Sequence, residues 1–346
     1  MEKDITTTIG CDLGDKESEV FVLKEDGTSD RDRVRTTKAG MRRFFEQAPA
    51  HVVIEVGEHS RWVGELLEEL GHRVTVANSR RVRLISENDS KTDRTDAELL
   101  ARLGRADATL LSPVVHRGRE AQAELAMVKA RDVLVASRTR LVSHVRAVVK
   151  SFGERLPRCT AESFHRRTRA EVPAELRPAL EPIYEALTRV EEQIRALDRT
   201  IGRAAKKHPE VALVSQPHGV GELTGLTFIL TLGDKERFRK SRMAGAFVGL
   251  RPRKSQSGSG DPQLRITKAG DPLLRRLLVN CANHILGPFG ADSDVRRWGL
   301  KLAERGGKNA KKRAKVAVAR KLAVLMHRLW VTGEVYQAIG YGRTAA

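Results

Sequence analysis

The chain is poor in cysteine and in long apolar runs, and each shortage excludes a class of protein. Its 346 residues contain three widely separated cysteines, Cys11, Cys159 and Cys281, which argues against a disulfide framework or a cysteine-based zinc site. No stretch approaches the roughly 18 apolar residues of a membrane span, and the polar N-terminal segment lacks the apolar core of a signal peptide. We therefore expect a cytoplasmic protein that does not bind membranes.

Aromatic residues are also scarce, and the 44 acidic residues are outnumbered by 63 basic ones. Aromatics at 4% of the chain disfavour a single-strand binder that stacks bases on aromatic platforms. The formal net charge of +19 is uneven, because residues 1–112 carry a net charge of −4 and residues 113–346 carry +23. Clustered basic charge indicates a polyanionic partner. Nucleic acid is favoured over the alternative of basic helices that are merely solvated.

The length predicts two or three domains, and the apolar pattern places an α/β domain first. Three strands, a helix, a strand, a helix and a strand are predicted at Ile5–Leu13, Glu19–Leu23, Asp32–Thr36, Lys38–Gln47, His51–Val56, Trp62–Leu70 and Arg73–Ala77. This order is typical of a ribonuclease H-type mixed sheet flanked by helices. We expect domains at residues 1–115, 116–207 and 208–346.

The rest of the chain reads as mostly helical. Two long helices are predicted at Glu120–Phe152 and Leu180–Ala205, with a proline-rich basic stretch between them. They favour an antiparallel coiled-coil arm, with an ordinary helical bundle as the alternative. The pattern Gly219-x-Gly221, followed by the apolar helix Leu223–Leu232, resembles a helix-hairpin-helix turn, whose glycines let backbone N–H groups approach a phosphate. A plain helix–helix turn is an equally good interpretation.

Four acids in the first domain have positions that suit metal chemistry. Asp12 ends the first predicted strand, Glu55 lies in the apolar run VVIEV, and Asp93 and Asp96 begin the helix DAELLARL. Two acids three residues apart point the same way on a helix, and converging carboxylates need a cation, with oxygen ligands selecting Mg²⁺ or Mn²⁺. Taken singly, Asp12 could merely end a strand, and Asp93 or Asp96 could be a helix N-cap. Glu58 is a lower-ranked alternative ligand.

A serine-rich loop lies in the basic half. Ser255, Ser257 and Ser259 alternate in the segment KSQSGSG, within residues 251–270, which lack hydrophobic periodicity. A serine hydroxyl is a poor nucleophile unless a base or a metal activates it. From composition alone, a flexible serine–glycine linker is the preferred interpretation.

Sequence blocks in both halves resemble the insertion sequence one-ten family of transposases, the bridge-RNA-guided DEDD recombinases. The first half carries IGCDLG, VIEV and KTDRTDAELLARL, and the second carries GVGELTG, GDKERF, FVGLRP and RITKAGDPLLRRLL in the same order as the family. The resemblance covers nearly the whole chain. It implies a RuvC-like domain, a transposase domain and a place in the prokaryotic cytoplasm, associated with the nucleoid.

The resemblance also implies a mechanism. Asp12, Glu55, Asp93 and Asp96 would bind Mg²⁺, and Ser257 would attack DNA to form a transient phosphoserine link. The two parts of the site can come from different subunits of a tetramer, and a structured RNA from the element pairs with target and donor DNA. The family commonly has Ser-Ser-Gly-Gly where this chain has Gln-Ser-Gly-Ser at residues 256–259, so Ser255 and Ser259 remain open as nucleophiles.

Two groups of basic residues are expected to contact nucleic acid backbones. The first flanks the serine loop and the second lies in Lys301–Lys321, which holds nine basic residues and one acid; they comprise Arg251, Arg253, Lys254, Arg265 and Lys268, then Lys308, Lys311, Lys312, Arg313 and Lys315. The alternative roles are solubility and a solvated helix face. Two other functions stay open: a RuvC-like metal-dependent endonuclease in which water attacks, and a non-catalytic RNA- or DNA-binding protein.

Overall fold

The computed structural model describes residues 5–78, 93–255, 264–307 and 309–340. The chain divides into two compact units, Met1–His116 and Arg117–Ala346. The division into three domains expected from the sequence stays a prediction. Within the described residues, no helix is long and apolar enough to cross a membrane.

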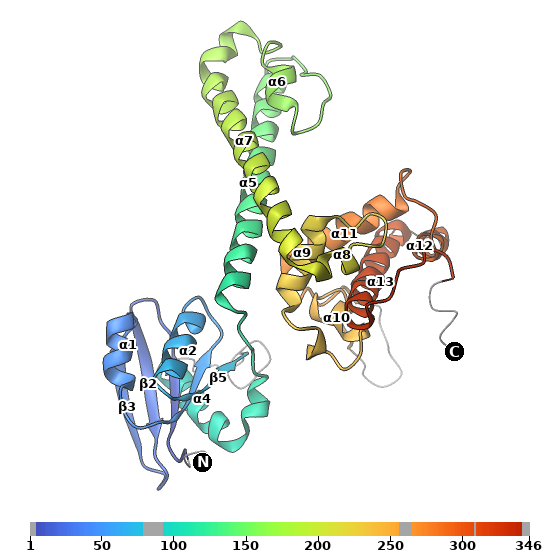
Figure 1. The fold of residues 1–346 in the computed structure, drawn as a ribbon. Coiled ribbons are helices and arrows are strands. Elements are labelled where there is room, and N and C mark those ends of the chain that lie inside the picture. The colour runs from blue at the N-terminus through green and yellow to red at the C-terminus, as the bar shows by residue number, and fades with distance from the viewer. Residues whose placement is uncertain (1–4, 79–92, 256–263, 308, 341–346) are drawn as a thin grey trace. The chain divides into compact units, whose positions relative to one another are not determined.

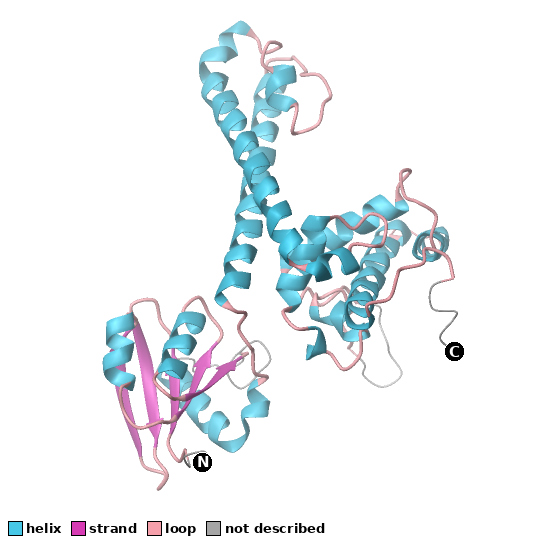
Figure 2. Cartoon of the chain, viewed as in Figure 1, coloured by secondary structure: helices cyan, strands magenta, loops and turns pink. Residues whose placement is uncertain are grey.

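The first unit is built on a five-stranded mixed sheet (Figures 1 and 2). Its strands are β1 (Thr8–Asp12), β2 (Glu17–Leu23), β3 (Ser29–Arg35), β4 (His51–Glu55) and β5 (Arg73–Ala77), in the spatial order β3-β2-β1-β4-β5. The strands β1, β2 and β3 form an antiparallel meander, whereas β4 runs parallel to β1 and β5 parallel to β4. The order of elements predicted from the apolar pattern is confirmed.

Helices pack on both faces of this sheet. On one face, α1 (Lys38–Phe45) and α2 (Ser60–Glu69) share a buried core with alternate residues of the strands, such as Ile9 and Cys11 of β1. On the other face lies α4 (Asp93–Asp107), followed by the short helix η2 (Ala108–Leu111). Successive side chains of a strand point to opposite faces. Gly10 and Asp12, which alternate with Ile9 and Cys11 in β1, therefore lie on the face that α4 covers.

Gly10 sets how closely α4 approaches the sheet. A Cβ atom at this position would lie 2.0 Å from the carbonyl oxygen of Ala97 and 2.6 Å from the backbone nitrogen of Ala101. Only a residue without a side chain leaves room for the helix backbone here. Ala97 and Ala101 are small and buried, and they pack with Phe21 and Leu23 of β2. The helix backbone therefore lies directly on β1.

Two long helices of the second unit form a helical hairpin (Figure 1). The helix α5 (Arg119–Ser151) spans 33 residues and α7 (Arg177–Lys207) spans 31, as the apolar pattern predicts to within a few residues at each end. The short elements α6 (Phe164–Thr168) and η3 (Ala174–Leu176) lie between them in sequence. A separate apolar cluster closes the tip, with Phe164 packed against the α7 residues Leu180 and Tyr184. We call this hairpin the arm.

A buried ion pair joins the two helices of the arm. The Arg138 guanidinium of α5 donates a hydrogen bond of 2.6 Å to the Glu191 carboxylate of α7, and both residues are less than 8% exposed. Arg195 reaches the same carboxylate at 3.1 Å and Arg138 also reaches Glu162 at 3.3 Å. Such charges are tolerated in an interior only while they remain paired.

The remaining helices form a body around a shared core. They are α8 (Pro209–Val214), α9 (Glu222–Leu232), η4 (Lys235–Arg237), α10 (Arg242–Phe247), α11 (Pro272–Leu286), α12 (Asp294–Glu304) and α13 (Ala310–Thr332). Nearly all of α9 is buried, and its Phe228 ring meets Trp330 of α13 edge-on at 6.4 Å. Gly219, with φ +91°, lies against His284 and Ile285 of α11. The turn before α9 is therefore closely packed on α11.

The buried ion pair gives a prediction about the arm. Substitution Glu191→Ala removes the main partner of the buried Arg138 guanidinium, so we expect a loss of about 3–5 kcal/mol in the local stability of the arm. The neighbouring Glu192→Ala removes a half-exposed partner of Arg189 and should cost less than about 1 kcal/mol. Amide hydrogen exchange in α5 and α7 measures both values. Equal exchange in the two variants would contradict the prediction.

Candidate functional site

Asp12 and Glu55 end two neighbouring parallel strands at the same register. Cys11 of β1 is the register partner of Ile54 of β4. Asp12 and Glu55 are the next residues of the two strands, so they occupy equivalent positions at the strand ends. Cys11 and Ile54 belong to the core shared with α1 and α2. Because side chains alternate along a strand, Asp12 and Glu55 both lie on the opposite face, which α4 covers. Both residues are partly buried.

The N-terminal turn of α4 brings further acids to the same edge. Asp96 is 2% exposed and directly precedes Ala97, the residue that packs on Gly10 of β1. Asp93, the first residue of the helix, is exposed. The two acids that the spacing puts on one helical face thus differ sharply in burial. Gly10, on which Ala97 packs, lies two residues before Asp12 at the end of β1. The contact between helix and sheet therefore positions Asp96 near this end of the strand.

A further acid on this edge was missed from the sequence. Glu19 of β2 is the register partner of Asp12, and it lies on the same face as Phe21 and Leu23, which pack with α4. Its carboxylate lies 2.6 Å from an Arg33 guanidinium nitrogen and 3.8 Å from one of Arg94. The signal that could have found it is the hairpin register of β1 and β2 combined with strand alternation.

Cys11 precedes Asp12 in β1 but points to the opposite face of the sheet, into the core shared with α1 and α2. Burial, and then the neighbouring Asp12 carboxylate, raise the pKa of the Cys11 thiol well above its usual range. A thiol held protonated is a poor nucleophile and a poor metal ligand. The residue acts as a small apolar side chain in the core of the sheet.

The donor chemistry of this edge fits a hard divalent cation. Asp12, Glu55 and Asp96 offer only carboxylate oxygens, the ligands that Mg²⁺ and Mn²⁺ prefer. Among the residues that the structure describes, no three His, Cys, Asp or Glu side chains form a ready metal-binding group. The backbone thus brings these acids to one edge of the sheet, while the described side chains do not form a closed set of ligands.

The second predicted part of the site surrounds the serine loop. Ser257 and Ser259 lie outside the described residues, whereas Ser255 is described and exposed. A short antiparallel ladder closes the base of the loop: the Arg253 N–H donates to the Arg265 carbonyl, and the Thr267 N–H donates to the Arg251 carbonyl, both at 2.9 Å. We call this ladder the loop base.

The loop base gathers the basic residues predicted there. Arg251, Arg253, Lys254, Arg265 and Lys268 are all exposed, and Arg253 and Arg265 are opposite each other in the ladder. Like charges directly opposite across two strands destabilise the pairing. An anion bound between them would relieve this repulsion.

The second predicted basic group lies at the beginning of α13. Lys311, Lys312 and Arg313 are exposed in its first turn, Lys315 is half-buried, and Lys308 lies outside the described residues. That turn contains no acid, and the Asn309 side chain does not cap it. Cations are unfavourable at the positive end of a helix dipole. This electrostatic cost also favours an anionic partner.

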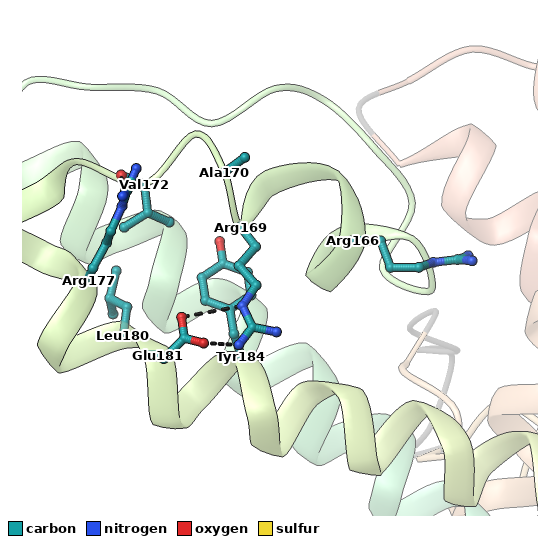
Figure 3. A pocket seen from close by; sticks show the side chains of 8 residues that line it. All are labelled: Arg166, Arg169, Ala170, Val172, Arg177, Leu180, Glu181 and Tyr184. Carbon is teal, nitrogen blue, oxygen red and sulfur yellow. Dashed lines mark hydrogen bonds and ion pairs between the residues drawn. The ribbon is translucent and has the colours of Figure 1, made fainter.

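A cavity at the tip of the arm was not expected from the sequence (Figure 3). It has a volume of about 460 Å³, with a floor that includes Leu180 and Tyr184 and a rim that includes Arg166, Arg169 and Arg177. Arg169 forms an ion pair with Glu181, and Figure 3 shows Arg166 extending away from that pair. The Arg177 side chain donates to the Val172 carbonyl at 3.3 Å.

Comparison with known proteins assigns the family. One family model, described as a transposase of the DEDD type, matches residues 9–153, and a second, described as the transposase IS116/IS110/IS902 family, matches residues 211–291. The chain belongs to the IS110 family of transposases. Together the two matches take in nearly all of the acid-bearing sheet, the whole of α5, and the helical body from α8 to α11.

Named relatives agree with this assignment. The transposase for insertion sequence element IS1111A of Coxiella burnetii is 32% identical over 256 residues, 72% of this chain and 69% of that protein. A probable family 20 transposase of Pseudomonas aeruginosa is 28% identical over 307 residues, 86% and 89% of the two chains. The transposase for insertion sequence element IS1328 of Yersinia enterocolitica is 28% identical, with 80% and 83% covered. This IS110-family transposase is therefore an enzyme of DNA transposition.

The contact between α4 and β1 gives a prediction about the site. Substitution Gly10→Ala puts a methyl group into the Ala97 backbone, so we expect α4 to shift and stability to fall by about 1–3 kcal/mol. Displacement of Asp96 should also lower transposition. Gly57→Ala is the matched control, since a Cβ there meets no atom within 4 Å. Thermal unfolding and a transposition assay measure both effects, and identical behaviour of the two variants would refute the role of Gly10.

Proposed function

We propose that this transposase is an RNA-guided recombinase that cleaves and rejoins DNA through a divalent metal site and a serine nucleophile. The observation that carries the proposal is the shared edge on which Asp12 and Glu55 lie at one register, beside Asp96 of α4. Carboxylates collected in this way repel one another unless a cation offsets their charge. The charge pattern and the family resemblance supply the remaining parts.

The four acids would hold the metal. Asp12, Glu55 and Asp96 come from adjacent parts of the sheet and helix, and Asp93 would join them from the first turn of α4. A bound Mg²⁺ or Mn²⁺ supplies charge stabilisation for the scissile phosphate and lowers the pKa of a coordinated hydroxyl. Glu19 would act on this edge indirectly, because its ion pair with Arg94 holds the guanidinium group of Arg94 at the first turn of α4.

The serine would exchange one phosphodiester bond for another. The Ser257 hydroxyl loses its proton and its oxygen attacks the phosphorus, forming a new P–O bond. The bond to one strand end breaks, and that end leaves as a hydroxyl after taking up a proton. Attack by the hydroxyl of another strand end on the phosphoserine reverses these changes and restores free serine. The number of phosphodiester bonds is conserved, so rejoining needs no added energy source.

The basic groups would hold the nucleic acids. The residues of the loop base surround the loop that carries Ser257, so they would neutralise phosphate charge next to the nucleophile. The first turn of α13 would contact a second stretch of backbone. Contacts of this kind carry no sequence information. A structured guide RNA, pairing with target and donor DNA on an oligomer of two to four subunits, would provide the sequence choice.

Removal of one carboxylate tests the metal site. We expect Glu55→Gln to lower DNA strand cleavage by at least about a hundredfold, because a ligand of the metal is lost. Glu58→Gln, an exposed acid three residues further on, should keep its activity. Chelation with EDTA should abolish cleavage in the unaltered protein, and Mg²⁺ or Mn²⁺ should restore it. Cleavage that persists in EDTA would exclude the metal mechanism.

Replacement of the serine tests the nucleophile. We expect Ser257→Ala to lose covalent protein–DNA adducts, measured by denaturing gel electrophoresis with labelled DNA, while Ser255→Ala and Ser259→Ala retain them. Normal adduct formation by Ser257→Ala would rule out this serine. Cleavage without an adduct in the unaltered protein would instead favour the endonuclease in which water attacks.

A further inference from the structure

A second cavity lies where the C-terminal half of α7 meets the beginning of α9. It has a volume of about 480 Å³ and is lined by Arg199, Gly202, Arg203, Lys206 and Glu222. We call it the arm-base cavity. It lies in the second unit, outside the acid-bearing sheet, and shares no residue with the loop base or with the first turn of α13.

Three cations line one side of the arm-base cavity. Arg199, Arg203 and Lys206 are spaced four and three residues apart, so they share one face of α7. At 1.5 Å per residue they extend over about 10 Å along the helix. All three are exposed. The row is long enough for successive charges of a linear polyanion, whereas a single small anion would need them closer together.

The cations of this row differ from most of the others on α7. Elsewhere on the helix Arg189 forms an ion pair with Glu192, Arg195 with Glu191, and Lys207 with Glu120. Within the part of the chain that the structure describes, Arg199, Arg203 and Lys206 have no acidic side chain within ion-pair distance; the one hydrogen bond of the Arg203 side chain goes to Thr200. Their charge is therefore available to a partner.

The other side of the arm-base cavity is formed by the beginning of α9. Gly202 leaves space there, and a Cβ on it would lie 3.6 Å from the Glu222 carboxylate. Glu222 offsets one of the three positive charges and leaves a net surplus. The first N–H groups of α9 have no partner within the helix and add partial positive charge at this end. No aromatic or apolar side chain lines the cavity, so its chemistry is mainly that of positive charge.

We infer that the arm-base cavity binds the phosphodiester backbone of a nucleic acid, independently of its sequence. The inference rests on the proposed function, since it assumes a nucleic acid bound to the second unit. It extends the binding surface from the helical body onto the arm. The tip cavity of Figure 3 is the weaker candidate, because its Arg169 is already paired with Glu181.

The salt dependence of binding tests the inference. Full-length protein is titrated with labelled duplex DNA and with labelled single-stranded RNA, both of arbitrary sequence, at several salt concentrations. Each phosphate contact contributes about 0.7–0.9 to the slope of log affinity against log salt. The triple variant Arg199→Gln, Arg203→Gln, Lys206→Gln should lower that slope by about 2–3 for the nucleic acid that occupies the cavity. The probe affected identifies DNA or RNA as the occupant.

Two further variants separate a specific site from a general charge effect. Arg189→Gln removes one exposed, paired cation from the same helix and should leave the slope unchanged. Glu222→Gln removes the negative charge of the cavity and should tighten binding severalfold at low salt. This gain of affinity keeps the test valid even if the triple variant folds poorly, which a loss of total helical signal in circular dichroism or a lowered melting temperature would reveal.

The outcomes distinguish this inference from the proposed function. An unchanged slope in the folded triple variant, or a change no larger than Arg189→Gln produces, overturns the arm-base cavity as a site. Metal-dependent cleavage by the unaltered protein would then leave the proposed function standing. Failure of the unaltered protein to bind either probe would overturn both.

Discussion

The close packing of α4 on β1 is the constraint on which the candidate active site depends. The position of Asp96 beside β1 depends on Gly10, which lets the backbone at Ala97 and Ala101 lie directly on the strand. Asp96 is 2% exposed, so its carboxylate is enclosed by the surrounding structure. The strands and the helix thus place the acids on well-defined elements of the fold.

The uneven charge of the chain has a structural counterpart. The acids that gather at one edge of the sheet belong to the unit with surplus negative charge. The other unit carries the surplus positive charge, and exposed cations of that unit gather at the loop base, at the first turn of α13 and in the arm-base cavity. Other basic residues of α7 form ion pairs with acids of α7 itself or of α5. The net charge therefore overstates the number of cations that are available to an anionic partner. Which cations are available depends on which of them form ion pairs with acids.

The arm combines rigidity with exposure. The buried pair of Arg138 and Glu191 ties α5 to α7 midway along their length, and the apolar cluster around Tyr184 closes the tip. A helical hairpin held at both places can keep a charged row on α7 in fixed geometry. Fixed geometry lowers the entropy lost when a flexible polyanion binds.

The sequence by itself determined the order of strands and helices, because local apolar periodicity is a property of neighbouring residues. It also located Asp12, Glu55, Asp93 and Asp96, and the uneven charge. Only the tertiary structure decided that Asp12 and Glu55 share a face with α4, that Glu19 joins them, and that Asp96 is buried while Asp93 is exposed. These facts depend on strand register and on a helix–sheet contact between residues some ninety positions apart (Gly10 and Ala97). Likewise, the composition counts the arginines, but only the fold shows which of them have a carboxylate nearby.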